Sequence, residues 1–208
     1  MSREKKTVLD LCSGLGGFSQ PFIDVGWDVV RIDNNPKFKD VPNTFIGDIR
    51  DLDFVYSLVR GKQLLLIVAS PPCERFSIAN RMFPKKGIRE ALDIIGSIYE
   101  IIAELRPRYW IVENPRGRLR WFLGKPNSTI HLSDYGGKYM KPTDLWHNFK
   151  FGLIEGKKQY EPSRTSIKNQ GKGSTGLLRL RDPSKRALLP YGLGESILKI
   201  IEGEKDNE

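Results

Sequence analysis

Hydrophobic and polar positions in the first half of the chain follow the pattern of strands and helices in alternation. Four short apolar runs are typical of buried strands and lie at residues 7–12, 27–33, 43–49 and 64–69. The last run, Leu-Leu-Leu-Ile-Val-Ala, is apolar at every position, which indicates a sheet covered on both faces. We predict helices in the intervals, at residues 18–25 and 54–60.

The clearest helical pattern lies at residues 89–105. Apolar residues recur there at steps of three and four and mark one buried face: Leu92, Ile95, Tyr99, Ile102 and Leu105. A fifth strand is expected at residues 109–112 and a sixth at residues 128–135. Strands and helices in this order give right-handed crossovers. We therefore predict an α/β fold with an open, mostly parallel, Rossmann-like sheet and helices on both faces.

The periodicity fades after Lys138 into a stretch rich in Gly, Lys and Ser, and a closing helix is expected at residues 190–202. A length of 208 residues is typical of one domain, so we expect a single domain over residues 1–208. Its late part, residues 138–186, is a short basic segment.

Positive charge is concentrated in that basic segment. It holds twelve Lys and Arg against four Asp and Glu, whereas the net charge of the whole chain is +9. A basic segment on a nearly neutral body indicates a protein that binds a polyanion such as nucleic acid. A solvated loop is the alternative interpretation of the same charges.

Composition excludes several classes of protein. With 39% hydrophobic and 28% charged residues, the chain fits neither wholesale disorder nor a membrane bundle, and no apolar run reaches the roughly 18 residues of a membrane span. Its N-terminus leads into a strand without a secretory apolar region, so we expect an intracellular, cytoplasmic protein. Cys12 and Cys73 are the two cysteines, which argues against a disulfide framework or a metal site and leaves a reactive thiol possible.

Two motifs at the ends of the early strands favour a nucleotide-like ligand, because ligands of open parallel sheets bind beyond the carboxyl ends of the strands. The first strand runs into Asp10-Leu-Cys-Ser-Gly-Leu-Gly-Gly, whose glycines allow close approach of the backbone, although a tight turn alone would also need them. Asp33 can accept hydrogen bonds from ribose hydroxyls and Asp48 from an adenine amino group, or both can be turn residues. Because Ser19 replaces the third glycine of a dinucleotide motif, an adenosine-containing cofactor fits better than a nicotinamide dinucleotide.

Two further motifs carry reactive side chains. Ser70-Pro71-Pro72-Cys73 follows the apolar strand, and two prolines produce a stiff turn that projects Cys73 into the cleft. A buried, inert cysteine is the less favoured alternative. Glu113-Asn114-Pro115 follows the fifth strand, so that its carboxylate would face the same cleft as an acid or base.

Together these motifs resemble those of the S-adenosylmethionine-dependent cytosine C5-methyltransferase family over about residues 7–201. The segment at residues 10–19 resembles the family's cofactor loop, Pro71-Pro72-Cys73 its nucleophile loop, and Glu113-Asn114-Pro115 its Glu-Asn-Val element. The combination of residues 113–120 with residues 141–146 resembles the short phage and archaeal branch of the family.

The resemblance implies transfer of a methyl group from S-adenosylmethionine to C5 of cytosine in DNA. Cys73 would attack C6 of the ring, and Glu113 would hold the N3 edge. Because both faces of the ring must be reached, the base has to be flipped out or single-stranded. The residues implied in cofactor binding are Asp10, Cys12, Gly14, Leu15, Gly16, Asp33, Asn34, Asp48, Ile49, Ser70, Glu195 and Ser196. Those implied in nucleic-acid binding are Arg75, Ser77, Lys141, Arg179 and Arg181.

The sequence departs from the family at several places, which include Pro115 in place of Val and Glu195 in place of Asn. Cys12 stands where an aromatic residue usually packs against the cofactor. The element Gln-x-Arg-x-Arg is replaced by Tyr139, Lys141 and Thr143. Its last arginine usually helps to hold the base, and Lys141 or the pair Arg179 and Arg181 are the candidates to replace it. Only about 40 residues, 147–186, stand in place of a target-recognition domain.

Several alternatives stay open at this point. The same chemistry could act on RNA, or the chain could be a non-catalytic nucleic-acid-binding relative that modifies nothing. A nicotinamide-dependent dehydrogenase is a third alternative. The short recognition segment also leaves room for a partner protein or self-association, and the sequence does not determine the oligomeric state.

Overall fold

A computed structural model describes residues 5–78, 87–137, 141–149 and 187–203. In chain order its helices and strands are β1 (Lys6–Leu11), α1 (Gln20–Asp24), β2 (Asp28–Asp33), the 3₁₀-helix η1 (Pro36–Phe38), β3 (Thr44–Ile46), α2 (Leu52–Val59), β4 (Gln63–Ala69), α3 (Ile88–Leu105), β5 (Tyr109–Pro115), α4 (Arg120–Leu123), β6 (Ser128–His131), the 3₁₀-helix η2 (Leu132–Tyr135), β7 (Pro142–His147) and α8 (Tyr191–Gly203).

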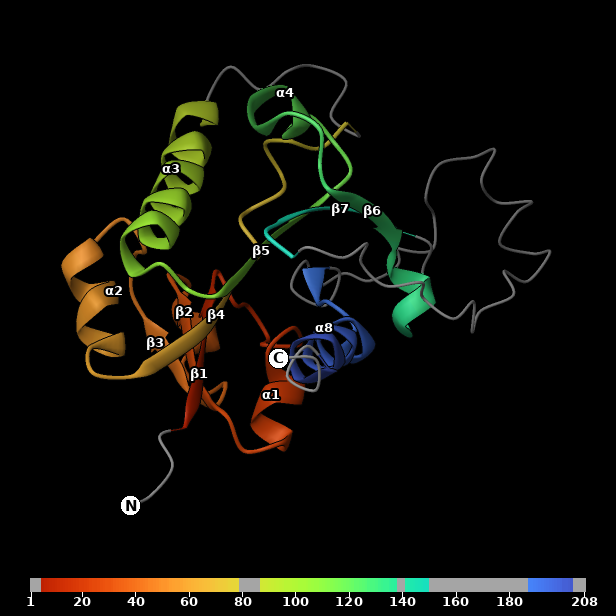
Figure 1. The fold of residues 1–208 in the computed structure, drawn as a ribbon. Coiled ribbons are helices and arrows are strands. Elements are labelled where there is room, and N and C mark those ends of the chain that lie inside the picture. The colour runs from red at the N-terminus through yellow and green to blue at the C-terminus, as the bar shows by residue number, and fades with distance from the viewer. Residues whose placement is uncertain (1–4, 79–86, 138–140, 150–186, 204–208) are drawn as a thin grey trace.

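The strands of the described residues form one sheet in the order β3-β2-β1-β4-β5-β7-β6. Strands β1 to β5 are parallel, and β7 is antiparallel to both β5 and β6. Helices α1 and α8 pack together on one face, whereas α2 and α3 cover the other (Figure 1). This arrangement confirms the predicted open, mostly parallel, Rossmann-like sheet.

The hydrophobic core lies in two layers, one on each face of the sheet. Alternate residues of one strand serve opposite layers: Val8 packs with α1 and α8, and Leu9 packs with α2 and α3. Such strands must be apolar along their whole length, which explains the continuous apolar run of β4. Its last four residues, from Leu66 onward, are fully buried.

Two features of the second half differ from the sequence prediction. The expected sixth strand is only four residues long and continues as the 3₁₀-helix η2. Strand β7 was not expected, because polar residues interrupt its apolar pattern, yet Thr143, Asp144 and His147 are buried in it. The closing helix is confirmed at α8. Most of the basic segment lies outside the described residues.

Within the described part of the chain, no helix is both long enough and apolar enough to cross a membrane.

Candidate active site

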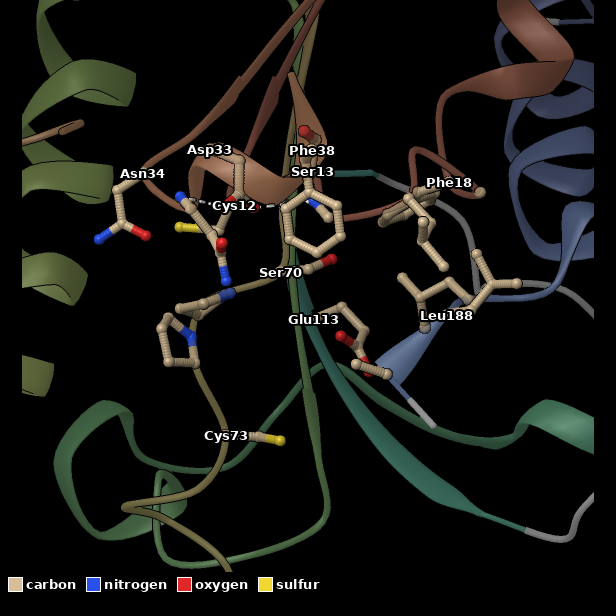
Figure 2. A pocket seen from close by; sticks show the side chains of 18 of the residues that line it. Cys12, Ser13, Phe18, Asp33, Asn34, Phe38, Ser70, Cys73, Glu113 and Leu188 are labelled. Atoms are coloured by element: carbon tan, nitrogen blue, oxygen red, sulfur yellow. Dashed lines mark hydrogen bonds between the residues drawn. The ribbon is translucent and has the colours of Figure 1, made fainter. Parts of the chain in front are cut away.

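A pocket opens at the carboxyl ends of β1, β2, β4 and β5 (Figure 2). It brings together many of the residues singled out in the sequence: Cys12, Gly14, Leu15, Asp33, Asn34, Asp48, Ile49, Ser70, Cys73, Glu113 and Lys141. Figure 2 shows Cys12, Asp33 and Asn34 at one end of the pocket and Cys73 at the other, with Ser70 and Glu113 between them. The pocket therefore has a nucleotide-like end and a thiol end.

A buried polar network supports the glycine loop at the nucleotide-like end. The Ser19 hydroxyl donates to Asp10 Oδ2 at 2.5 Å, and Arg31 Nε donates to the Ser19 oxygen at 2.8 Å. Arg31 Nη2 also donates to the Gly16 carbonyl at 2.9 Å. A Cβ on Gly16 would lie 2.4 Å from Arg31 Cζ, and the Gly16 φ is +72°. Gly16 therefore leaves room for a buried arginine and does not line the pocket.

Asp33 connects the end of β2 to the glycine loop. Its Oδ2 accepts from the Gly14 amide and its Oδ1 from the Asn35 amide, both at 2.9 Å. A carboxylate oxygen can accept two hydrogen bonds, so each oxygen keeps one acceptor position. These positions fit the two hydroxyls of a ribose, which is the role predicted for Asp33.

The other polar residues at this end are differently engaged. Asp48 forms an ion pair with Arg50, which holds the pKa of Asp48 below its ordinary value chiefly through that hydrogen bond. Burial, reinforced by Asp33 and Asp10, raises the pKa of the Cys12 thiol far above its usual range. The Cys12 thiol is therefore kept in its neutral form.

Apolar side chains complete the walls of the nucleotide-like end. Phe18, Phe38, Leu188 and Leu189 line the pocket, and none of them was predicted. Gly14 packs near the Phe38 ring, because a Cβ there would lie 3.9 Å from Phe38 Cζ. Phe38 thus supplies an aromatic surface beside the loop in which Cys12 replaces an aromatic residue. The combination of a glycine loop, a carboxylate and apolar walls fits an adenosine-containing cofactor.

The thiol end is positioned by a hydrogen bond between two strand ends. Asn114 Nδ2 donates to the Pro71 carbonyl at 3.0 Å, and Asn114 is fully buried. This bond joins the end of β5 to the turn that carries Cys73. In the sequence Asn114 is only a member of the Glu-Asn-Pro motif, and its bond to Pro71 depends on the fold.

Cys73 and Glu113 line the same pocket, as the sequence predicted. Burial raises the pKa of the Cys73 thiol, Lys141 acts in the opposite direction, and Glu113 adds to the rise. Burial also raises the pKa of Glu113 to about 7, again opposed by Lys141. Glu113 Oε1 is buried and has no hydrogen-bond partner among the described residues. Glu113 therefore has a pKa near neutral pH and a carboxyl oxygen to which no described residue donates a hydrogen bond.

Lys141 lines the pocket together with Cys73 and Glu113, and its charge favours the ionised form of both. The alternatives Arg179 and Arg181 lie outside the described residues. Among the described residues that line the pocket, Lys141 is therefore the cationic side chain beside the reactive groups.

Several predicted site residues lie outside the pocket lining. Asp10 and Gly16 belong to the buried hydrogen-bond network that supports the glycine loop. Arg75 lies against Gly87 at the start of α3, and the Ser77 carbonyl accepts from Arg118 at 2.6 Å. On α8, Glu195 pairs with Lys199, and the Ser196 hydroxyl donates to the Gly192 carbonyl. Residues 187–189, just before α8, line the pocket instead.

The comparison with protein families gives one match over more than half of the chain. The family described as C-5 cytosine-specific DNA methylase matches residues 6–122. This range contains the glycine loop, Cys73 and Glu113.

Curated relatives agree with that match. The chain is 31% identical over 156 residues to the probable DNA (cytosine-5)-methyltransferase of Frog virus 3, which covers 67% of this chain and 69% of the relative. It is also 31% identical over 135 residues to type II methyltransferase M.AplI of Arthrospira platensis, which covers 62% of this chain. For type II methyltransferase M.HgiGI of Herpetosiphon aurantiacus, the identity is 31% over 120 residues, with 54% of this chain and 93% of the relative covered.

The share of the relatives that the chain spans differs widely, and it spans only 37% of the length of M.AplI. The family match nevertheless extends over the whole pocket except its late edge at Lys141 and residues 187–189. On these grounds the chain belongs to the family of C-5 cytosine-specific DNA methylases.

Proposed function

We propose that this protein transfers a methyl group from S-adenosylmethionine to C5 of a cytosine in DNA through a covalent adduct with Cys73. The observation that carries the proposal is that Cys73 and Glu113 line one pocket, whose nucleotide-like end lies beside them. Membership of the C-5 cytosine-specific DNA methylase family supports the substrate and the reaction.

The chemistry requires a nucleophile because C5 of cytosine is itself weakly nucleophilic. Attack of the Cys73 thiolate on C6 pushes electron density to C5, which can then accept a methyl group. S-adenosylmethionine supplies this methyl group. Loss of the C5 proton to a base then allows the thiolate to leave as the C5–C6 double bond reforms.

Glu113 and Lys141 assist the attack of Cys73 in two different ways. A protonated Glu113 donates a hydrogen bond to N3 of the ring, which withdraws electrons as the adduct forms. Its pKa of about 7 keeps a large protonated fraction near neutral pH. Lys141 stabilises the thiolate in a site where burial disfavours it.

The nucleotide-like end of the pocket orients the methyl donor. Asp33 accepts from two backbone amides and would hold the ribose hydroxyls through its remaining acceptor positions. Phe38 and Leu188 line the pocket and would exclude water from the bound cofactor. The thiol end then receives the cytosine, which must leave the stack of bases to reach Cys73.

The two cysteines allow a direct test. Wild-type protein, Cys73→Ala and Cys12→Ala are each incubated with labelled cofactor and one of three substrates. The substrates are fragmented genomic DNA, tRNA and a duplex that contains 5-fluorocytosine. Wild-type protein should incorporate label and form a denaturant-resistant complex with the fluorinated duplex, because fluorine blocks the loss of the C5 substituent. Cys73→Ala should do neither and should still bind the cofactor. Cys12→Ala should retain the covalent complex.

Turnover by Cys73→Ala would overturn the mechanism. Label in tRNA and none in any DNA would overturn the proposed substrate. Cofactor binding without product on either nucleic acid would instead favour a non-catalytic relative.

A further inference from the structure

An exposed apolar surface lies beside the loop that carries Cys73. Its members are Trp121 and Phe122 on α4 and Ile78 on the facing loop, with side chains 70%, 43% and 65% exposed. We refer to these three residues as the Trp121 surface. Contiguous exposed apolar groups are typical of interaction sites, whereas exposed apolar residues that stand singly are common on protein surfaces.

The Trp121 surface is attached to the nucleophile loop by several contacts. The Arg118 amide donates to the Phe76 carbonyl at 2.8 Å, and Arg118 Nη1 donates to the Ser77 carbonyl at 2.6 Å. The rings of Phe76 and Phe122 meet edge to face with centroids 6.1 Å apart. The Arg118 guanidinium also lies 5.8 Å from the centre of the Trp121 ring. α4 therefore packs against the loop that follows β4 and carries Cys73 (Figure 1).

The chain segment that carries Trp121 and Phe122 is basic. Residues 114–133 contain four Lys and Arg and no Asp or Glu. Arg120 is engaged with the buried Asp144, whereas Arg116 and Lys125 are exposed. Exposed aromatic rings between exposed cations are the composition of a nucleic-acid-binding surface, in which rings stack on bases and cations meet phosphates.

We propose that the Trp121 surface contacts the DNA beside the cytosine that enters the pocket, with the Trp121 ring stacked on a neighbouring base. The proposal rests on the proposed function, since it places the DNA target at the thiol end. A cytosine that leaves the duplex exposes the faces of adjacent bases, and an aromatic ring next to the pocket covers such a face.

The charge decides between DNA and a second copy of this chain as the occupant. Trp121 and Phe122 lie in a basic, acid-free stretch, so two copies that met through them would bring like charges together. A polyanion with apolar base faces meets both properties of the surface.

The test measures binding of a fluorescent, mixed-sequence DNA duplex by anisotropy at several salt concentrations, using the full chain with cofactor product added. Trp121→Ala should weaken binding about tenfold, as expected for the removal of one base–aromatic stack, and leave the slope against log salt unchanged. Trp121→Phe should retain most of the affinity. Arg116→Gln should instead reduce the slope by about one, because it removes a cation that neutralises a phosphate.

The matched control is Phe45→Ala on β3, at the edge of the sheet opposite β6. Phe45 is an exposed aromatic residue like Trp121, and 43% of its surface is exposed. This variant should leave DNA binding unchanged. Tryptophan fluorescence gives a second readout, since Trp27 and Trp146 are buried, Trp110 is half-buried and Trp121 is exposed. Bound DNA should shield the emission from a soluble quencher in wild-type protein and not in Trp121→Phe.

Unchanged DNA affinity in Trp121→Ala would overturn the proposal. Loss of self-association in that variant, seen by sedimentation, would assign the surface to a second copy, and weakened binding of RNA alone would exclude DNA as the partner. None of these results depends on turnover, so they are separate from the Cys73→Ala test of the proposed function.

Discussion

At the scale of single residues, burial more than neighbouring charge sets the protonation of the two groups that are proposed to react. It is the largest cause of the raised pKa values of both Cys73 and Glu113. The consequences differ, because a thiol must lose its proton to attack, whereas a carboxyl group must keep its proton to donate. Burial therefore helps Glu113 in its proposed role and hinders Cys73, and Lys141 offsets the second effect.

The raised pKa of Glu113 predicts a pH dependence of stability. Its carboxyl has a pKa of about 7 in the fold against 4.5 for the ordinary group, so the folded state holds more protons between these values. The free energy of unfolding should therefore fall as the pH rises from 4.5 to 7, with a contribution from Glu113 on the order of 3 kcal/mol. Denaturant unfolding of Glu113→Gln at pH 5 and pH 8 should show the variant gaining on the wild type at the higher pH.

Part of the slope should survive in that variant, because burial also raises the pKa of Asp10 to about 7. Asp10→Asn is the comparison that removes this second contribution. A Glu113→Gln variant that keeps the full wild-type slope would contradict the proposed titration of Glu113.

At the scale of elements, the apolar runs predicted β1, β2, β4 and β5 closely because each strand is buried on both faces. The same criterion failed for β7, where Asp144 is buried through its pairing with Arg120 and its hydrogen bond from Thr129. These partners lie 24 and 15 residues away in the sequence, and nothing local to β7 reveals them. A polar residue can enter a sheet when a distant partner satisfies it.

The hydrogen bond between β5 and the Pro71 turn predicts a positioning role for Asn114. Asn114→Leu leaves the Pro71 carbonyl without its donor, which should lower the free energy of unfolding by about 1–3 kcal/mol. The rate of covalent complex formation at Cys73 should fall ten- to hundredfold, on the order expected for a displaced nucleophile.

Asn148→Leu is the matched control for this prediction. Asn148 also bonds the backbone of β5, where its Oδ1 accepts from the Trp110 amide at 2.8 Å, but at the opposite end of the strand from the pocket. It should lose stability and keep the rate of covalent complex formation. Equal rates in the two variants would show that the Asn114 bond does not position Cys73.

At the scale of the whole molecule, sheet order brings together motifs that are far apart in the sequence. β1 lies between β2 and β4, and β5 lies next to β4. The carboxyl ends of these parallel strands therefore bring together the glycine loop, Asp33, Cys73 and Glu113. The open sheet was predicted from the alternation of strands and helices and the family from these motifs, and both are confirmed. The roles of individual site residues and the phage and archaeal branch stay predictions.

The distribution of charge over the molecule predicts how salt affects DNA binding. Replacement of Arg179 and Arg181 by Gln should weaken binding and reduce the slope of log affinity against log salt by about one for each phosphate that is no longer neutralised. A double variant of Lys62 and Lys199, both paired with surface acids, changes the net charge equally and should leave the slope nearly unchanged. An unchanged slope in the arginine variant would place these side chains away from the DNA.

The sequence by itself determined the alternation of elements, the residues at the strand ends and the family, because these depend on local patterns and short motifs. Only the tertiary structure decided which apolar residues wall the pocket, that Asn114 bonds the Pro71 turn, and that Arg31 lies beneath the glycine loop. Each of these depends on contacts between segments distant in the chain. The packing of side chains from different elements sets them, and no local pattern records that packing.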